Sequence, residues 1–190
     1  MTKIEKWECE ARLLFAIVVA GKSEKFARKV IAKFLVDMCD TPGDTPLQYV
    51  KRLHEQGVLE ARLREVKSGS YGRISKAFAG VVDMDVYACT IQQLEAIHGI
   101  GPKTSRFFIM WTRPDSRHAA LDRHILRWMA YLGYDVPKNT PTGDKYLVIE
   151  KQFISEADER GKTPRDLDAE IWEHYSQGGN DNSLPKSLRP

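Results

Sequence analysis

The sequence predicts an all-α protein, and three observations carry the prediction. Apolar side chains recur three and four residues apart over most of the 190 residues, as they do on one face of a helix. Helix caps such as Thr45-Pro and Thr163-Pro precede several of these segments, and proline suits a first helical position. No stretch of useful length alternates polar and apolar residues as a half-buried strand does.

The expected helices follow from these caps and from the glycines that interrupt the apolar pattern. The first helix has a nearly all-apolar second half, so we expect it to be buried. The polar run from Gly178 lacks an apolar anchor, which predicts a disordered tail over 179–190. Apart from a pair around residue 100, the expected helices span residues 5–20, 24–39, 45–55, 58–66, 73–82, 123–132, 143–159 and 165–176.

Composition excludes several classes of protein. The 42% hydrophobic content can bury a core as one compact unit or two small lobes. The longest apolar run, Leu13 to Ala20, is too short to span a bilayer, and the N-terminal residues lack the layout of a signal peptide. Cys9, Cys39 and Cys89 are odd in number and widely spaced, so we expect reduced thiols, no metal site and a cytoplasmic protein without a membrane partner.

The net charge is only +3, but the charges are unevenly distributed. A basic middle part and an acidic C-terminal quarter suit a protein that lays one face on a phosphate backbone. Lys22, Lys25, Arg73 and Arg123 are our candidates for DNA contacts on that face. The alternative is that long helices carry mixed charges for solubility. The basic clusters are Lys22, Lys25, Arg28, Lys29 and Lys33; Arg62, Arg64, Lys67, Arg73 and Lys76; and Lys103, Arg106, Arg113, Arg117, Arg123 and Arg127.

Residues 90–111 predict two helices joined by a tight hairpin. A threonine and a glutamine three residues apart form a capping box at the start of the first helix. Gly99 and Gly101 end that helix and bracket Ile100, so the backbone can approach another surface without Cβ clashes while the isoleucine fills the turn. Pro102 suits the first turn of the second helix, where a missing N–H costs nothing.

Such a hairpin leaves backbone amides pointing out of the turn, beside the positive end of a helix dipole. These groups make a seat for a phosphate. The alternative is an ordinary interhelical turn, in which Gly-x-Gly also occurs. We expect the seat to contact duplex DNA, and a monovalent cation is the one candidate cofactor there. The residues assigned to this contact are His98, Gly99, Ile100, Gly101 and Thr104.

Lys103 lies in the first turn after the hairpin, and Asp122 follows 19 residues later in Leu-Asp-Arg-His, just before another helix. With these residues the sequence resembles the helix-hairpin-helix superfamily of DNA glycosylases. The pattern of that family is Leu-x-x-h-x-Gly-h-Gly-x-Lys-Thr-Ala, with h apolar, followed by h-Asp-x-His. The likeness extends to the apolar segment from Leu13 and to Gly69-Ser-Tyr-Gly-Arg-Ile-Ser-Lys-Ala, so it covers roughly residues 10–130.

The resemblance implies a two-lobed helical bundle with a helix-hairpin-helix motif, acting as a monomer. It implies one glycosylase-like unit over 1–178, in which lobe A covers about 22–111 with the hairpin and lobe B covers about 1–21 plus 112–178. Many members of the family end in a four-cysteine iron–sulfur loop. This chain has no cysteine after Cys89, which excludes such a cluster.

The resemblance also implies an enzyme that flips a nucleotide out of the duplex and excises its base, with AP-lyase chemistry. Lys103 falls on the family's nucleophilic lysine and Asp122 on its catalytic aspartate. A lysine attacks carbon only as the free amine, which a helix N-terminus and apolar neighbours such as Phe107 favour. A carboxylate at the mouth of a helix can face the positive charge that develops on the sugar.

Two alternatives stay open. The scaffold also looks like that of phage-type amino acid:DNA transferases, which modify an activated 5-hydroxymethyluracil base in the host cytoplasm and leave the glycosidic bond intact. A free amino acid would then be the co-substrate, Lys103 and Asp122 would orient or deprotonate its amine, and Lys22 or Arg123 would hold its carboxylate. Three residues depart from the glycosylase pattern: Lys22 stands where glutamine or asparagine is usual, His98 where proline is usual, and Arg123 where threonine is usual.

The second alternative is a non-catalytic DNA-binding module, in which Lys103 touches a phosphate and Asp122 caps its helix.

Overall fold

The computed structural model describes residues 4–40 and 43–190, apart from the side chains of residues 39 and 40. Within those residues the protein is all-α: ten α-helices and three short 3-10 helices form, and no strand does. The expected fold class is therefore confirmed. None of the helices in this part of the chain is long and apolar enough to cross a membrane.

Contacts divide the chain into two compact units, one that ends at Phe108 and one that begins at Ile109. α7 (Pro102–Thr112) therefore begins in unit 1 and ends in unit 2. The other helices of unit 1 are α1 (Lys6–Val19), α2 (Glu24–Leu35), η1 (Val36–Asp40), α3 (Pro46–Glu55), α4 (Leu59–Glu65), α5 (Tyr71–Val81) and α6 (Ile91–Glu95). Unit 2 also contains α8 (Arg123–Tyr131), α9 (Gly143–Glu159), α10 (Pro164–Ser176), η2 (Asp181–Ser183) and η3 (Lys186–Leu188).

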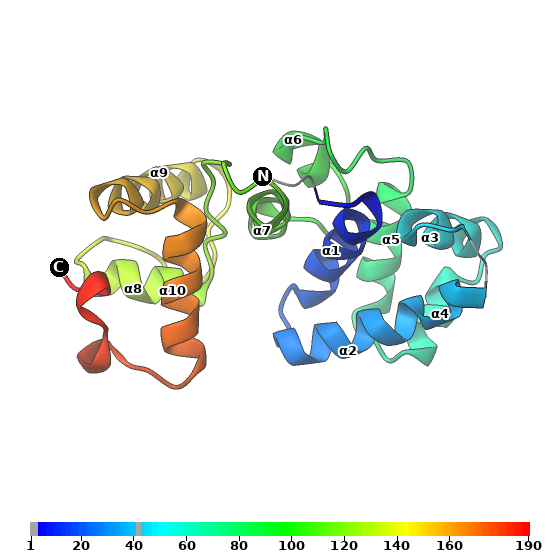
Figure 1. Ribbon diagram of the computed structural model, residues 1–190, viewed down its shortest axis with the longest axis horizontal. Helices are drawn as coiled ribbons and strands as arrows, with labels where there is room; N and C mark the ends of the chain where they lie inside the picture. Colours follow the sequence, from blue (N-terminus) through cyan, green and yellow to red (C-terminus); the bar gives the residue numbers. More distant parts are fainter. Residues whose placement is uncertain (1–3, 41–42) are drawn as a thin grey trace. The chain divides into compact units, whose positions relative to one another are not determined.

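α1 is the central helix of unit 1. Residues 13–18 of α1 are all apolar and buried, and the helix packs against α2, α3 and α5 (Figure 1). Phe34 of α2 adds an edge-on contact with Tyr49 of α3 at a ring-centroid distance of 5.5 Å. We expected residues 1–21 to join the second lobe. The structure instead places α1 in unit 1, because these neighbours cover its apolar surface; residues 1–3 lie outside the described part.

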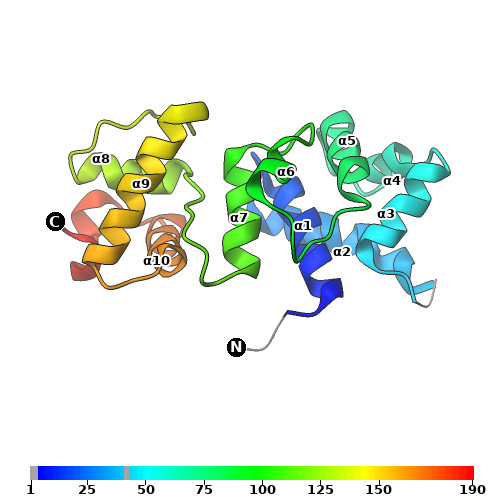
Figure 2. The same ribbon diagram turned by 90° about the horizontal axis from the view of Figure 1, so that it is seen from above.

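Unit 2 packs α8, α9 and α10 around an aromatic core (Figure 2). Trp128 of α8 meets Phe153 of α9 edge-on at a centroid distance of 6.0 Å, and Leu167 of α10 is buried in the same core. The Tyr134 hydroxyl donates to Glu156 Oε1 at 2.5 Å. This hydrogen bond, together with burial, raises the pKa of Tyr134 to about 12.

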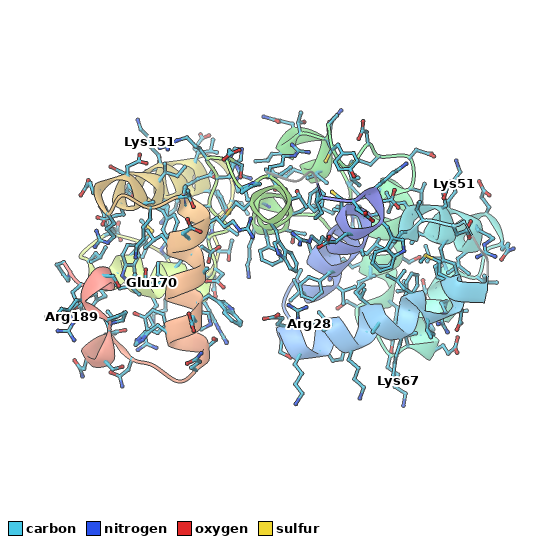
Figure 3. The ribbon with its side chains drawn as sticks, viewed as in Figure 1. Arg28, Lys51, Lys67, Lys151, Glu170 and Arg189 are labelled. Atoms are coloured by element: carbon cyan, nitrogen blue, oxygen red, sulfur yellow. The ribbon has the colours of Figure 1, made fainter. Side chains whose placement is uncertain are left out.

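The C-terminal residues belong to this core. Leu184 and Leu188 are buried, and Trp128 Nε1 donates to the Leu188 carbonyl at 2.8 Å. Glu170, which projects from α10 in Figure 3, accepts a hydrogen bond from the Ser187 hydroxyl of η3. The expected disorder of 179–190 is therefore wrong, because the two leucines supply the apolar anchor that the polar run from residue 178 lacks.

Candidate functional site

The hairpin between α6 and α7 has the local geometry that its sequence predicts. The Thr90 hydroxyl accepts from the Gln93 amide at 3.2 Å, and the Gln93 side chain accepts from the Thr90 amide at 2.8 Å, which completes the capping box. Gly99 has a φ of 90°, a left-handed conformation that glycine adopts readily. Ile100 is buried and its amide donates to the Ile97 carbonyl at 3.1 Å, so Ile100 fills the turn as expected.

Arg73 of α5 holds the hairpin from the inside of unit 1. Its guanidinium donates to the Gly99 carbonyl at 3.0 Å and to the Ile17 carbonyl of α1 at 3.1 Å. Burial lowers the pKa of Arg73. We assigned Arg73 to a DNA contact, but its two hydrogen bonds brace the hairpin against the end of α1. Sequence reasoning could not find this role, because both partners are backbone carbonyls far away in the chain.

Two further contacts of the hairpin were also missed. A Cβ on Gly80 of α5 would lie only 2.5 Å from Ile97 Cγ2, so the missing side chain lets α5 and the hairpin pack closely. Glu95 accepts a hydrogen bond from the Ser105 hydroxyl at 2.8 Å and pairs with the buried Arg106, which ties α6 to α7. The glycine inside an otherwise regular helix was the one signal for the first contact.

The opposite side of the hairpin is open. Gly101 does not have a positive φ, and a Cβ added to it would meet no described atom within 4 Å. No contact within the described protein therefore requires glycine at this position. His98 is exposed on the same turn, as a DNA-contacting residue would be. Thr104 is buried instead, so its side chain is not presented to an external ligand as we expected.

Lys103 lies in the first turn of α7, one residue after Pro102, and is partly buried. The first amides of a helix have no acceptor within that helix, and the positive end of the α7 dipole lies at the same place. Phe107 lies one turn further on, on the same face of the helix. It contacts Phe15 of α1 at a centroid distance of 6.5 Å.

Asp122 is the N-cap of α8 in unit 2. Its Oδ1 accepts bonds from the amide of His124 at 2.7 Å and from the next amide at 3.0 Å. The Tyr146 hydroxyl holds the preceding residues, since it accepts from the Leu121 amide at 3.0 Å and donates to the carbonyl two residues earlier at 2.7 Å. The cap and Tyr146 together fix the position of the carboxylate within unit 2.

His124 packs against α10. Its ring stacks on that of Tyr175 at a centroid distance of 5.8 Å. Arg123 is exposed, and its Nε donates to the His124 ring at 3.4 Å. The Tyr175 hydroxyl bonds to Asp181 at 3.0 Å, and burial raises the pKa of Tyr175. The residues beside Asp122 are thus supported by the C-terminal segment.

Lys22 follows α1, and its side chain lies against the loop before α5. Its Nζ donates to the Ser70 hydroxyl at 3.4 Å and lies 5.4 Å from the centroid of the Phe26 ring. Ser70 and Lys67 in that loop have φ values of 45° and 58°, which residues with side chains seldom adopt. Lys25 is exposed on α2. Unlike Lys22, Lys25 makes no hydrogen bond or ion pair with any side chain that the structure describes.

The candidate residues fall into two groups. Unit 1 carries the hairpin, Lys103, Arg73 and the lysines of α2, and unit 2 carries Asp122 and Arg123. In the described part of the chain, no group of three or more histidine, cysteine, aspartate or glutamate side chains could hold a metal ion. No protein-family model matches the chain, and no solved structure matches it significantly. Function is therefore inferred from the chain's own residues.

Proposed function

We propose that the chain binds duplex DNA through the hairpin, flips a nucleotide and excises its base as a DNA glycosylase with AP-lyase chemistry. The observation that carries the proposal is the two-sided hairpin. Gly99, Ile100 and Arg73 fix its inner side, while Gly101 is open on the outer side. A glycine without an internal reason suits a backbone that must come close to a phosphate, and Lys103 supplies an amine beside that seat.

In the proposed reaction, the Lys103 amine attacks C1′ of the flipped deoxyribose. A bond forms between Nζ and C1′, the bond from C1′ to the base nitrogen breaks, and the base leaves with those electrons and takes up a proton. The resemblance assigns the stabilisation of the positive charge that develops on the sugar to a carboxylate, that of Asp122. The adduct loses a proton from nitrogen, and the C1′–O4′ bond then breaks while O4′ takes up a proton, which leaves a protonated imine. Loss of a proton from C2′ and departure of the 3′ phosphate with the electrons of the C3′–O bond then cleave the strand.

One observation favours the transferase as a second candidate. Lys22 places a cation in the loop where the resembled glycosylases have a neutral amide, and it is held there beside Ser70. A cation suits the carboxylate of an amino acid co-substrate. A transferase would attach that amino acid to an activated 5-hydroxymethyluracil base and would make no sugar cation.

Borohydride trapping tests the nucleophile, because it reduces the imine to a stable adduct. Wild-type protein should be trapped on a duplex that carries its substrate base, and Lys103→Gln should abolish trapping while duplex binding stays nearly unchanged. Lys151→Gln, which alters an exposed lysine of α9, is the matched control and should be trapped normally. An adduct that persists in Lys103→Gln would move the nucleophile elsewhere.

Asp122→Asn separates the proposed activities. Asparagine keeps the size and the capping ability but removes the charge, so base release should slow by a factor on the order of 10²–10³ with little change in binding. The readout is free base and alkali-labile sites on duplexes carrying candidate bases. Intact strands that gain the mass of an amino acid, only when an amine donor is supplied, would refute the glycosylase and support the transferase. Binding without either product would leave a DNA-binding module.

Gly101→Glu tests the hairpin as the DNA contact. A carboxylate at the open side should repel phosphate and weaken binding, and wild-type binding should fall steeply with salt through counterion release. The fold should tolerate the change, because a Cβ at Gly101 meets no described atom within 4 Å. Unchanged affinity for duplex DNA in a folded Gly101→Glu variant would refute the hairpin as the DNA contact.

A further inference from the structure

About half of the described basic side chains of unit 1 pair with a carboxylate, and four neighbouring exposed lysines are among those that do not. Lys25, Lys29 and Lys33 of α2 and Lys67 after α4 make no ion pair with any side chain that the structure describes. We call these four residues the α2 lysine face. The paired residues are Lys6 with Glu10, Arg12 with Glu8, Arg28 with Glu24, Lys51 with Asp83, Arg52 with Asp44, Arg62 with Asp37 and Glu65, Arg64 with Glu60, and Arg106 with Glu95.

Three members of the face lie along one side of α2. Lys25, Lys29 and Lys33 are four residues apart, about one helical turn, so they form a row roughly 12 Å long. The opposite side of α2, which includes Val30 and Phe34, is buried in unit 1. The row is therefore the outward side of a helix whose apolar side is already covered.

Lys67 is brought beside this row by the segment from α4 to α5, which runs alongside α2. At one end Arg62 donates to the Lys33 carbonyl at 2.6 Å, and at the other Lys22 bonds to Ser70 at 3.4 Å. Lys67 lies between these two anchors in a left-handed conformation, with a φ of 58°. Its side chain extends outward from unit 1 (Figure 3).

This arrangement is unfavourable for the isolated protein. Like charges one turn apart on a helix repel, and both Lys25 with Lys29 and Lys29 with Lys33 have this spacing. Among the described residues, the one carboxylate a helical turn away from the row along the chain is that of Asp37, which pairs with Arg62 at 2.9 Å. A glutamate at position 29 would remove both repulsions and form two favourable pairs instead. An external anion is the natural counterpart of such a row.

We propose that the α2 lysine face is a second phosphate-contact surface, on which one strand of duplex DNA lies while the hairpin holds another stretch of backbone. The inference rests on the proposed DNA binding and extends it beyond the hairpin. The three lysines of the row can each face one of the successive phosphates of a strand. An anionic membrane fits less well, because a helix at a membrane surface gives its apolar face to lipid, and α2 buries that face in unit 1.

The hairpin and the residue that precedes α2 both contact the start of α5 within unit 1. Arg73 donates to the hairpin carbonyl of Gly99 at 3.0 Å, and Ser70, three residues earlier, accepts from Lys22 just before α2. A DNA strand held at the hairpin can therefore continue past one turn of α5 towards α2.

The test measures duplex affinity against salt for wild type, Lys29→Glu and Lys151→Glu. Lys151 is an exposed lysine of α9 in unit 2, so both variants change the net charge equally (Figure 3). Lys29→Glu should weaken binding on the order of tenfold at low salt, to a similar degree on every sequence, and reduce the slope of log K against log salt by about 1 or more. Its melting temperature should be equal to or higher than that of wild type, because two repulsions are removed.

The outcomes separate this inference from the proposed function. Equal weakening by Lys29→Glu and Lys151→Glu, or weakening by neither, would overturn the α2 lysine face. A Lys29→Glu effect combined with normal binding by Gly101→Glu would support the face and reject the hairpin. Wild-type protein that binds no duplex at any salt would overturn both. Loss of binding to anionic vesicles, with duplex affinity intact, would assign the face to a membrane and refute the inference.

Discussion

At the scale of single residues, the two hairpin glycines are present for different reasons. Gly99 has a φ of 90°, and a Cβ there would lie 2.8 Å from Arg73 Cγ and 3.1 Å from the Arg73 carbonyl oxygen. Gly101 has neither constraint. Gly99→Ala should therefore lower the free energy of unfolding by about 1–3 kcal/mol, while Gly101→Ala should change it by well under about 1 kcal/mol. Urea unfolding measures both, and equal losses would contradict the distinction.

Tyr134 gives unit 2 a dependence on alkaline pH. Its hydrogen bond to Glu156 raises its pKa from 10.0 to about 12, so the folded protein favours the protonated phenol. The resulting stabilisation is fully present below pH 10 and is lost as the pH rises through the range between 10 and 12. Tyr134→Phe should flatten part of this decline. Urea unfolding at a series of pH values compares the two proteins, and parallel curves would exclude the contribution of Tyr134.

At the scale of elements, Gly80 shows a packing demand that outweighs helix propensity. Alanine in place of an exposed helical glycine usually stabilises by about 1 kcal/mol. A Cβ on Gly80 would lie 2.5 Å from Cγ2 of Ile97, a β-branched side chain with little rotamer freedom, so we expect Gly80→Ala to destabilise by roughly 1 kcal/mol or more. Gly72→Ala in the same helix meets no such contact and should stabilise.

Thermal unfolding of the single variants and of Gly80→Ala with Ile97→Ala checks the assignment. The second substitution removes the clashing methyl group, so the double variant should lose less than the sum of the two single changes. A stabilised Gly80→Ala protein would show that Ile97 moves aside without cost.

The caps of individual helices could be predicted from sequence because their partners lie three residues apart. Thr45 with Gln48 and Thr90 with Gln93 both form complete capping boxes. The braces of the hairpin could not be predicted in this way, because Arg73 acts on a carbonyl 26 residues away. A local sequence pattern therefore predicts that a turn forms, but not which tertiary contacts stabilise it.

At the scale of the whole molecule, hydrophobicity predicts which segments are buried but not against what. Residues 13–18 of α1 were expected to be buried and are, yet they pack in unit 1 rather than in the second lobe. Leu184 and Leu188 were overlooked because two isolated leucines in a polar segment give no periodic signal. The candidate site was predicted best where it depends on the hairpin and worst where a side chain such as Thr104 turns inward.

The C-terminal anchor predicts a stability effect far from the hairpin. Leu188 is fully buried against the core of unit 2, so Leu188→Ala should cost about 2–4 kcal/mol. Leu147→Ala on α9 removes the same atoms from a side chain that is 53% exposed and should cost well under about 1 kcal/mol. Urea unfolding compares them, and a tail that contributes nothing would show similar small losses for both.

The repulsion between the lysines of α2 has a practical consequence for engineering. A library screened only for heat resistance should enrich acidic substitutions at Lys25 or Lys29, since each relieves a like-charge neighbour. Such variants would be obtained in good yield and would score as improved in assays of stability. If the α2 lysine face binds DNA, these variants would have lost affinity for the duplex. Optimisation of stability should therefore leave the outward side of α2 unchanged.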